Sequence, residues 1–222
     1  MYSKIRLYLL KNADQNNENS VSRIHREKRH RLFFNFCSEF ESPVKVIDLG
    51  GSDYYWKNLP EAEIERFRIT IVNKDDQSEG KNISFIKHDV RDLSFIKDEE
   101  YDIVFSNSLI EHISNDEELK KLADEIRRIG NKFFIQTPNY YFPVEPHFLF
   151  PFFQFLPENI KVNLAMKHSL GWFEKQTDID KAKEIVNSVR LLKEKELRVL
   201  FPGCKIYKEK YFLLNKSFIV FN

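Results

Sequence analysis

The sequence contains little cysteine. Only Cys37 and Cys204 occur among 222 residues, and no CxxC pair is present. Two isolated cysteines give no framework of disulfide bonds and no structural zinc site, and they favour a reducing compartment. The spacing of histidine, aspartate and glutamate also suggests no metal site. The sequence therefore predicts a cytoplasmic protein without a metal centre.

An excess of charge and long apolar runs are also lacking. Lysine and arginine number 35, aspartate and glutamate number 34, and the net charge is +1. This balance does not point to nucleic acid as a partner. No apolar stretch approaches the roughly 20 residues that span a bilayer, and the apolar run near the N-terminus lacks a small-residue cleavage site. We expect a soluble or at most peripheral protein without a transmembrane segment.

Short apolar runs recur along the chain with helical patterns between them. Each run has the composition of a buried strand, and the five expected strands cover residues 44–49, 68–73, 83–89, 102–107 and 132–137. Strands that alternate with helices indicate a mainly parallel sheet covered on both faces. Two late runs, 205–210 and 212–221, leave no room for a helix between them. They are expected to pair as an antiparallel hairpin.

Two helices are indicated by their first residues and their periodicity. Residues 11–20 are polar and predict a flexible entry segment, after which Ser20 can cap a helix over 20–40. Its expected inner residues are Val21, Ile24, Leu32, Phe36 and Phe40. The basic run 23–31 could meet an anionic substrate, but a solvated face of that helix is the more common explanation for such a run. A second helix should start at a capping box of Ser114 and Glu117 and end at Gly130.

The alternation stops after Thr137. Residues 138–172 are rich in proline and phenylalanine, which predicts an inserted cap over the carboxyl edge of the sheet. The Phe-rich segment 148–156 has several interpretations: the packed floor of that cap, a dimer contact, the lining of an apolar acceptor site, or a peripheral membrane contact. A helix is expected over 189–200, before Pro202 and Gly203.

The loop after the first strand is the first candidate for a ligand site. Gly50 and Gly51 allow close approach of the backbone to a ligand at the carboxyl edge of the sheet. A dinucleotide fingerprint requires glycine at positions 50, 52 and 55, where this chain has Gly, Ser and Tyr. Tyr55 would crowd the contact that the third glycine serves. A nicotinamide-dependent oxidoreductase is therefore disfavoured.

Five segments in order resemble the motif set of class I S-adenosylmethionine-dependent methyltransferases, closest to a bacterial methyltransferase type 11-like subgroup. They are IDLGGSDYYW, ITIVN, FIKHDVRDL, YDIVFSNSLIEHI and FFIQTPNYYFPVEPH, and they cover residues 44–147. The resemblance implies a Rossmann-like α/β fold whose mainly parallel seven-stranded sheet ends in the C-terminal hairpin. We expect a single domain over 1–222: N-terminal helix 20–40, core 44–137, helical cap 138–172, and C-terminal helix and hairpin 188–222.

The same resemblance assigns the cofactor, S-adenosylmethionine, to residues of this chain. Those expected to shape or line its methionine pocket are Asp48, Gly50, Gly51 and Ser52, and Asn73 stands where an acid usually holds the ribose. Asp89 and Val90 stand at the adenine, and Ser106, Asn107 and Ser108 should face the sulfonium. The chain departs from the pattern at Ser52, Tyr54 and Asn73, and Asp75 is an alternative ribose ligand. An amide lacks the two charged acceptors of a carboxylate.

Methyl transfer needs a positioned nucleophile and, for a hydroxyl acceptor, a base. His147 is the leading candidate because its ordinary pKa lies near working pH, and Glu145 is placed to orient it. His112 is the second candidate, while His25, His30, His88 and His168 are expected at the surface. Each of the first two histidines also has a purely structural interpretation, in which it locks the cap or opens a helix.

The sequence predicts a methyltransferase that acts on a small molecule, a glycan or a lipid-linked acceptor. A catalytically weak or inactive binding protein is the alternative suggested by Ser52 and Asn73. The acceptor, the choice between O- and N-methylation, and the oligomeric state are not indicated by the sequence.

Overall fold

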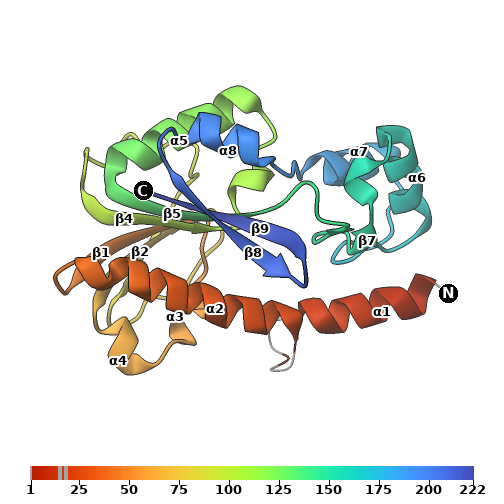
Figure 1. Cartoon of the computed structure of the whole chain (residues 1–222). Coiled ribbons are helices and arrows are strands. Elements are labelled where there is room, and N and C mark those ends of the chain that lie inside the picture. Colours follow the sequence, from red (N-terminus) through yellow and green to blue (C-terminus); the bar gives the residue numbers. More distant parts are fainter. Residues whose placement is uncertain (1, 15–16, 18–19) are drawn as a thin grey trace.

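A seven-stranded sheet forms the centre of the chain (Figure 1). The computed structural model describes residues 2–14, 17 and 20–222. The strand order is β3-β2-β1-β4-β5-β9-β8, with β1 to β5 parallel and β9 and β8 antiparallel to their neighbours. The strands are β1 (Val44–Leu49), β2 (Phe67–Asn73), β3 (Ile83–Lys87), β4 (Tyr101–Asn107), β5 (Gly130–Pro138), β8 (Lys205–Tyr211) and β9 (Leu214–Phe221). The predicted sheet and its C-terminal hairpin are confirmed.

Helices cover both faces of this sheet (Figure 1). On one face lie α2 (Val21–Phe36), η1 (Cys37–Glu39), α3 (Asp53–Lys57) and α4 (Glu61–Ile64), and on the other lie α5 (Asp116–Ile129) and α8 (Glu194–Leu200). In β1, Ile47 and Leu49 belong to the core under α5, whereas Val44 and Val46 belong to the core under α2. Because both faces are buried, the parallel strands show the continuous apolar runs by which the sequence predicted them.

Helix α5 begins one residue later than predicted. The side chain of Asn115 caps it, accepting hydrogen bonds from the backbone N–H groups of Glu117 and Glu118. The predicted capping box of Ser114 is therefore wrong, because the adjacent asparagine is an equally good cap. The predicted apolar face is buried, and the helix ends at Gly130 as expected.

Helix α2 is capped by Ser20 as predicted, with Oγ accepting from the backbone N–H of Arg23 at 3.0 Å. Its predicted inner face is partly wrong. Ile24 is 45% exposed, while the buried residues of the helix are His25, Arg29 and Phe33. The buried Arg29 of this helix contacts polar residues at the end of the sheet, Glu209 and Gln136, which is why a polar side chain lies inside.

Two histidines of α2 also differ from expectation. His25 is buried, and the ring of His30 packs edge-on against the ring of Tyr55 with centroids 4.6 Å apart. The prediction that both lie at the surface is wrong, because the helix lies on the sheet with these positions turned inward.

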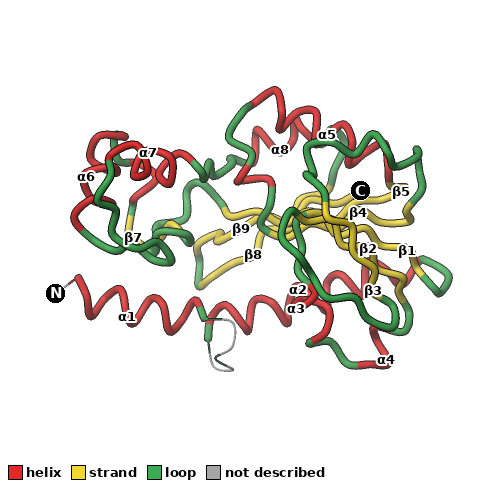
Figure 2. The backbone as a smooth tube through the Cα atoms, turned by 180° about the vertical axis from the view of Figure 1, so that it is seen from behind, coloured by secondary structure: helices red, strands yellow, loops and turns green. Residues whose placement is uncertain are grey.

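The chain before α2 contains a helix that the sequence did not predict, α1 (Tyr2–Ala13). The expected flexible segment 11–20 overlaps its end, and residues 15–16 and 18–19 of that segment lie outside the described residues. Figures 1 and 2 both show α1 running alongside the cap. Arg6 fixes this contact by donating to the carbonyl oxygen of Gly171 at 2.9 Å.

The cap leaves β5 at the carboxyl edge, as predicted, and has its own apolar core. Its elements are β6 (Val144–Glu145), β7 (Phe150–Pro151), η3 (Phe153–Phe155), α6 (Glu158–Lys167) and α7 (Ile179–Asn187). Helix α7 packs on α6, so this lobe continues beyond residue 172. The expected helix over 189–200 begins only at Glu194, because the chain before it is an extended connection out of the lobe.

The Phe-rich segment is split between the core of the cap and its surface. The rings of Phe148 and Phe153 are stacked with centroids 4.2 Å apart and are buried, whereas Phe152 and Phe155 are exposed. The interpretation as a packed floor therefore applies to part of the segment. Among the described residues, no helix is long and apolar enough to cross a membrane.

Candidate functional site

The loop after β1 is built so that only glycine fits. Gly50 has φ +70°, and a Cβ atom there would lie 2.6 Å from Cδ1 of Leu109. A Cβ atom on Gly51 would lie 1.8 Å from Oδ2 of Asp48. The loop ends at Ser52, the N-cap position of α3. Glycine is therefore required at both positions, because the side chains of Leu109 and Asp48 occupy the space of a Cβ atom.

Asp48 lies under this loop with an incompletely satisfied carboxyl group. Its side chain is almost fully buried, and Oδ2 accepts a hydrogen bond from Nε1 of Trp56 at 2.7 Å. Oδ1 has no hydrogen-bond partner among the residues that the structure describes. Burial raises the pKa of Asp48 to about 8, although the hydrogen bond from Trp56 acts in the opposite direction. A buried acceptor oxygen of this kind suits a donor that a ligand brings.

Asn73 ties the glycine loop to the end of β2. Its Nδ2 donates to the carbonyl oxygen of Gly51 at 2.7 Å, and its Oδ1 accepts from the backbone N–H of Asp75 at 3.1 Å. An aspartate at this position could not donate to the loop. The contact between Asn73 and a ribose stays a prediction, and Asp75 is exposed at the same edge.

The acid expected at the adenine is ion-paired in this structure. Asp89 follows β3, and its Oδ2 lies 2.6 Å from Nη2 of Arg91 and 3.0 Å from Nζ of Lys74. The hydrogen bond from Arg91 is the main cause that holds the pKa of Asp89 far below its usual range. The neighbouring Val90 is buried in the core.

The three residues expected near the sulfonium have different surroundings. Ser106 is fully buried and donates to the carbonyl oxygen of Leu49 at 3.0 Å. Asn107 and Ser108 reach a cavity, where Oγ of Ser108, at φ +59°, donates to Oε1 of Gln136 at 2.9 Å. The end of β4 therefore presents two of the three to a ligand space.

That cavity, here the sheet-edge pocket, has a volume of about 380 Å³. It lies between α1, α2, the ends of β4, β5 and β9, and the cap. Its lining residues are Tyr8, Leu9, Asn12, Ala13, Val21, Ser22, Arg29, Asn107, Ser108, Gln136, Pro138, Phe142, Val144, Pro146, His147, Leu149, Trp172, Tyr211, Lys216 and Ser217. Apolar side chains from α1 and the cap face polar groups at the sheet end, so the pocket suits an amphipathic small molecule.

A buried cation forms the polar end of the sheet-edge pocket. Arg29 pairs through Nε with Oε1 of Glu209 at 3.1 Å and donates through Nη1 to Gln136 and Asn107. Lys216 lies beside this group, and burial together with the charge of Arg29 lowers its pKa to about 8. The interpretation of 23–31 as a wholly solvated face is wrong for Arg29, because Glu209 is buried opposite it.

His147 stands at the junction of the cap and the core. Its Nδ1 donates to Oε1 of Glu145 at 2.7 Å, and its Nε2 lies 4.0 Å from Oε1 of Glu111. The other oxygen of Glu145 accepts the backbone N–H groups of His147 and Phe148. The ring of His112 meets the ring of His147 edge-on at 4.9 Å. The structure thus brings together the three candidate catalytic residues, His147, His112 and Glu145, with Glu111 as a fourth member.

The ionisation of this group follows from burial and mutual charge. Burial alone would lower the pKa of His147, but the hydrogen bond and charge of Glu145 and the charge of Glu111 raise it overall. The side chain of His112 reaches the surface, but partial desolvation and the charge of His147 lower its pKa. Burial raises the pKa of Glu111. Glu111, His112 and His147 present ligand atoms that lie within 4.8 Å of one another, an arrangement that could hold a metal ion and that the sequence did not indicate.

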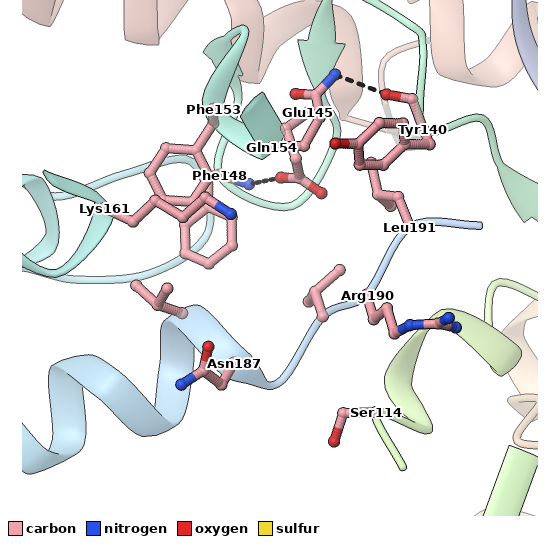
Figure 3. A pocket seen from close by; sticks show the side chains of 12 residues that line it. Ser114, Tyr140, Glu145, Phe148, Phe153, Gln154, Lys161, Asn187, Arg190 and Leu191 are labelled. Atoms are coloured by element: carbon pink, nitrogen blue, oxygen red, sulfur yellow. Dashed lines mark hydrogen bonds between the residues drawn. The ribbon is translucent and has the colours of Figure 1, made fainter. Parts of the chain in front are cut away.

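A second cavity, the cap pocket, lies on the other side of Glu145 and measures about 430 Å³ (Figure 3). Figure 3 shows the carboxylate of Glu145 at its edge, with Tyr140 and Gln154 beside it and Arg190 and Asn187 across the space. His147 lines the sheet-edge pocket and Glu145 lines the cap pocket, so this hydrogen-bonded pair separates the two cavities.

Sequence reasoning missed Glu111, Gln136 and Lys216, and it indicated Arg29 only as one member of the basic run 23–31. A charged residue in an otherwise apolar segment was the available signal for Glu111, which follows Leu109 and Ile110. Gln136 and Lys216 carry no local signal, since each acquires its role from the distant Arg29.

Three comparisons place the chain among known proteins. The protein family described as "Methyltransferase domain" matches residues 62–132. An uncharacterized protein of Mycobacterium tuberculosis is 37% identical over 59 residues, which are 27% of this chain and 20% of that protein. The chain therefore matches only about a fifth of the length of this curated relative.

Solved structures share the fold at low identity. A SAM-dependent methyltransferase from Archaeoglobus fulgidus has a TM-score of 0.54 and 14% identity, over 93% of this chain and 96% of that one. The 1,6-didemethyltoxoflavin-N1-methyltransferase of Burkholderia thailandensis, solved with 1,6-didemethyltoxoflavin and S-adenosylhomocysteine, has a TM-score of 0.51 and 12% identity, over 99% of this chain and 87% of that one. At these low identities, the similarity to both structures shows a shared fold only.

Proposed function

We propose that the chain is a class I S-adenosylmethionine-dependent methyltransferase, which transfers a methyl group from S-adenosylmethionine to a small-molecule, glycan or lipid-linked acceptor; the match of residues 62–132 to a methyltransferase domain supports this proposal. The acceptor is proposed to bind in the sheet-edge pocket. The observation that carries the proposal is the orphaned carboxylate oxygen of Asp48 beneath a loop where only glycine fits.

The residues at the carboxyl ends of β1, β2 and β4 fit the cofactor. The α-ammonium group of its methionine part is a donor for Oδ1 of Asp48, the buried carboxylate oxygen beneath the glycine loop. We assign Ser52 to the loop that holds the methionine part, and Asn73 to the support of this loop. Asp89 and Val90 are assigned to the adenine. The end of β4 (Ser106–Ser108) is assigned to the sulfonium. When bound, the cofactor supplies an activated methyl group on its sulfonium.

The chemistry of the sheet-edge pocket favours an acceptor with an anionic group. Arg29 and Lys216 carry two positive charges at its polar end, and Glu209 supplies one negative charge. An apolar body would contact the walls from α1 and the cap, while a carboxylate or phosphate would pair with the cations. The Burkholderia methyltransferase, which binds 1,6-didemethyltoxoflavin, supports a small molecule as the acceptor in this fold.

His147 is placed to contact the reacting group of that acceptor. It lines the same pocket as Asn107 and Ser108, and Glu145 holds its Nδ1 so that Nε2 is the nitrogen left for another partner. We propose that Nε2 of His147 receives the acceptor's proton, with Glu145 as a positioning residue and His112 beside the ring. Water exclusion by α1 and the cap would maintain this geometry.

Titration calorimetry tests the proposal against its alternatives. S-adenosylmethionine and S-adenosylhomocysteine should bind with one site per chain, and NAD should give no heat. Aromatic and acyl carboxylates should then support formation of S-adenosylhomocysteine better than their uncharged amides. Failure of both adenosyl ligands to bind would overturn the proposal. Binding without turnover across such a panel would favour the alternative of a non-catalytic binding protein.

A further inference from the structure

Three side chains from two distant segments converge between the cap and the core. Glu111 and His112 belong to η2 (Ile110–His112), which follows β4, and His147 belongs to the cap loop after β6. Their ligand atoms lie within 4.8 Å of one another. Two imidazoles with one carboxylate form a donor set that binds zinc and related divalent transition metals.

One oxygen of this cluster lacks a partner. Glu111 is fully buried, and its Oε2 accepts a hydrogen bond from Oγ1 of Thr137 at 2.9 Å. Its Oε1 has no hydrogen-bond partner in the part of the chain that the structure describes. Nε2 of His147 is 4.0 Å away, which is too far for a hydrogen bond. The buried Oε1 therefore points into the space between the three side chains without being satisfied.

Outer partners hold both rings in place. Nδ1 of His147 donates to Glu145 at 2.7 Å, which leaves Nε2 as the nitrogen facing Glu111. The ring of His112 is hydrogen-bonded to the backbone of Ser188. Metal-binding histidines usually donate their second ring N–H to a carboxylate or a backbone carbonyl in this way, which fixes the ring and its tautomer.

We infer that Glu111, His112 and His147 bind one divalent transition-metal ion, with zinc as the ion that this donor set fits best. Bonds of about 2.0–2.2 Å to such an ion set neighbouring ligand atoms roughly 3.3 Å apart. A contraction of about 1 Å or less per side chain brings the three groups to that spacing. Because His112 lies at the exposed rim, the ion can enter from solvent without unfolding of the cap.

The site adds to the proposed function without depending on it. An ion and a proton compete for the same lone pair on Nε2 of His147. His147 lines the sheet-edge pocket whereas Glu111 and His112 do not, so the proposed proton transfer to Nε2 of His147 belongs to the ion-free protein.

Metal titration of the chelator-treated full chain tests the inference. Zn²⁺ should bind with one ion per chain in calorimetry and raise the midpoint of thermal unfolding, and Co²⁺ should give a visible absorption band. His112→Gln, Glu111→Gln and His147→Gln should each weaken Zn²⁺ binding by a factor of about 10² or more. Glu145→Gln, which alters only the outer partner, should weaken it by about 10- to 100-fold. His168→Gln, at an exposed position after α6, is the matched control and should bind as the unaltered chain does.

Two results would overturn the inference: absence of saturable Zn²⁺ binding to the unaltered chain, or equal binding by the His112 and control variants. His112→Gln alters an exposed position and keeps the test valid if the buried Glu111→Gln variant does not fold. Titration of S-adenosylmethionine into the same proteins separates this inference from the proposed function. Loss of the metal should leave cofactor affinity unchanged, and a chain that binds zinc but not the cofactor would overturn only the proposed function.

Discussion

The cofactor side and the acceptor side of the sheet's carboxyl edge are constructed differently. On the cofactor side, Asp48, Gly50 and Gly51 lie within four residues of one another, and their fit depends on backbone conformation. On the acceptor side, Arg29 and Glu209 are 180 residues apart in the chain and are held by side-chain bonds. The first region holds a buried acid with one donor, whereas the second pairs its buried arginine with a buried carboxylate. Substitutions should therefore affect ligand affinity in the first region and folding stability in the second.

The largest expected effect is on the acceptor side. Glu209→Gln removes the only carboxylate that contacts the buried Arg29 among the described residues, and should lower the free energy of unfolding by about 3–5 kcal/mol. The matched control is Glu27→Gln, which breaks the exposed pair of Arg23 and Glu27 at 3.0 Å and should cost no more than about 0.5 kcal/mol. Urea denaturation measures both. Equal losses would mean that burial does not distinguish the two pairs.

The next effect concerns the glycine loop. Gly50→Ala places a Cβ at φ +70° and against Leu109, and should weaken S-adenosylmethionine binding by a factor on the order of 10² through displacement of the loop. Gly203→Ala introduces the same left-handed strain at φ +75°, where a Cβ would meet nothing within 4 Å. Both variants should lose about 1–2 kcal/mol of stability from backbone strain. Calorimetry should show reduced affinity only for Gly50→Ala, and unchanged affinity there would move the cofactor away from the loop.

The same contrast explains what the sequence predicted. Apolar periodicity is local, so the strands, the apolar face of α5 and the turn at Gly50 followed from neighbouring residues. The cap of α5 was misplaced by one residue because Ser114 and Asn115 are chemically similar caps. The buried position of Arg29 was not predicted because its partner Glu209 arrives only when β8 pairs beside the sheet end. Glu111 was missed for the same reason, since His147 reaches it only through the cap.

The most gradual effect is a pH dependence from Asp48. Burial raises the pKa of this carboxyl group from 3.8 to about 8, so between these values the folded chain binds more protons than the unfolded chain. The contribution of Asp48 to stability is therefore complete below about pH 4 and is lost as pH rises toward 8, with a slope of at most about 1.4 kcal/mol per pH unit. Asp48→Asn still accepts the hydrogen bond from Trp56 but does not titrate. Urea denaturation between pH 5 and 8 should thus show stability falling more steeply in the unaltered chain than in Asp48→Asn, and parallel profiles would show that Asp48 is ionised without penalty beneath the loop.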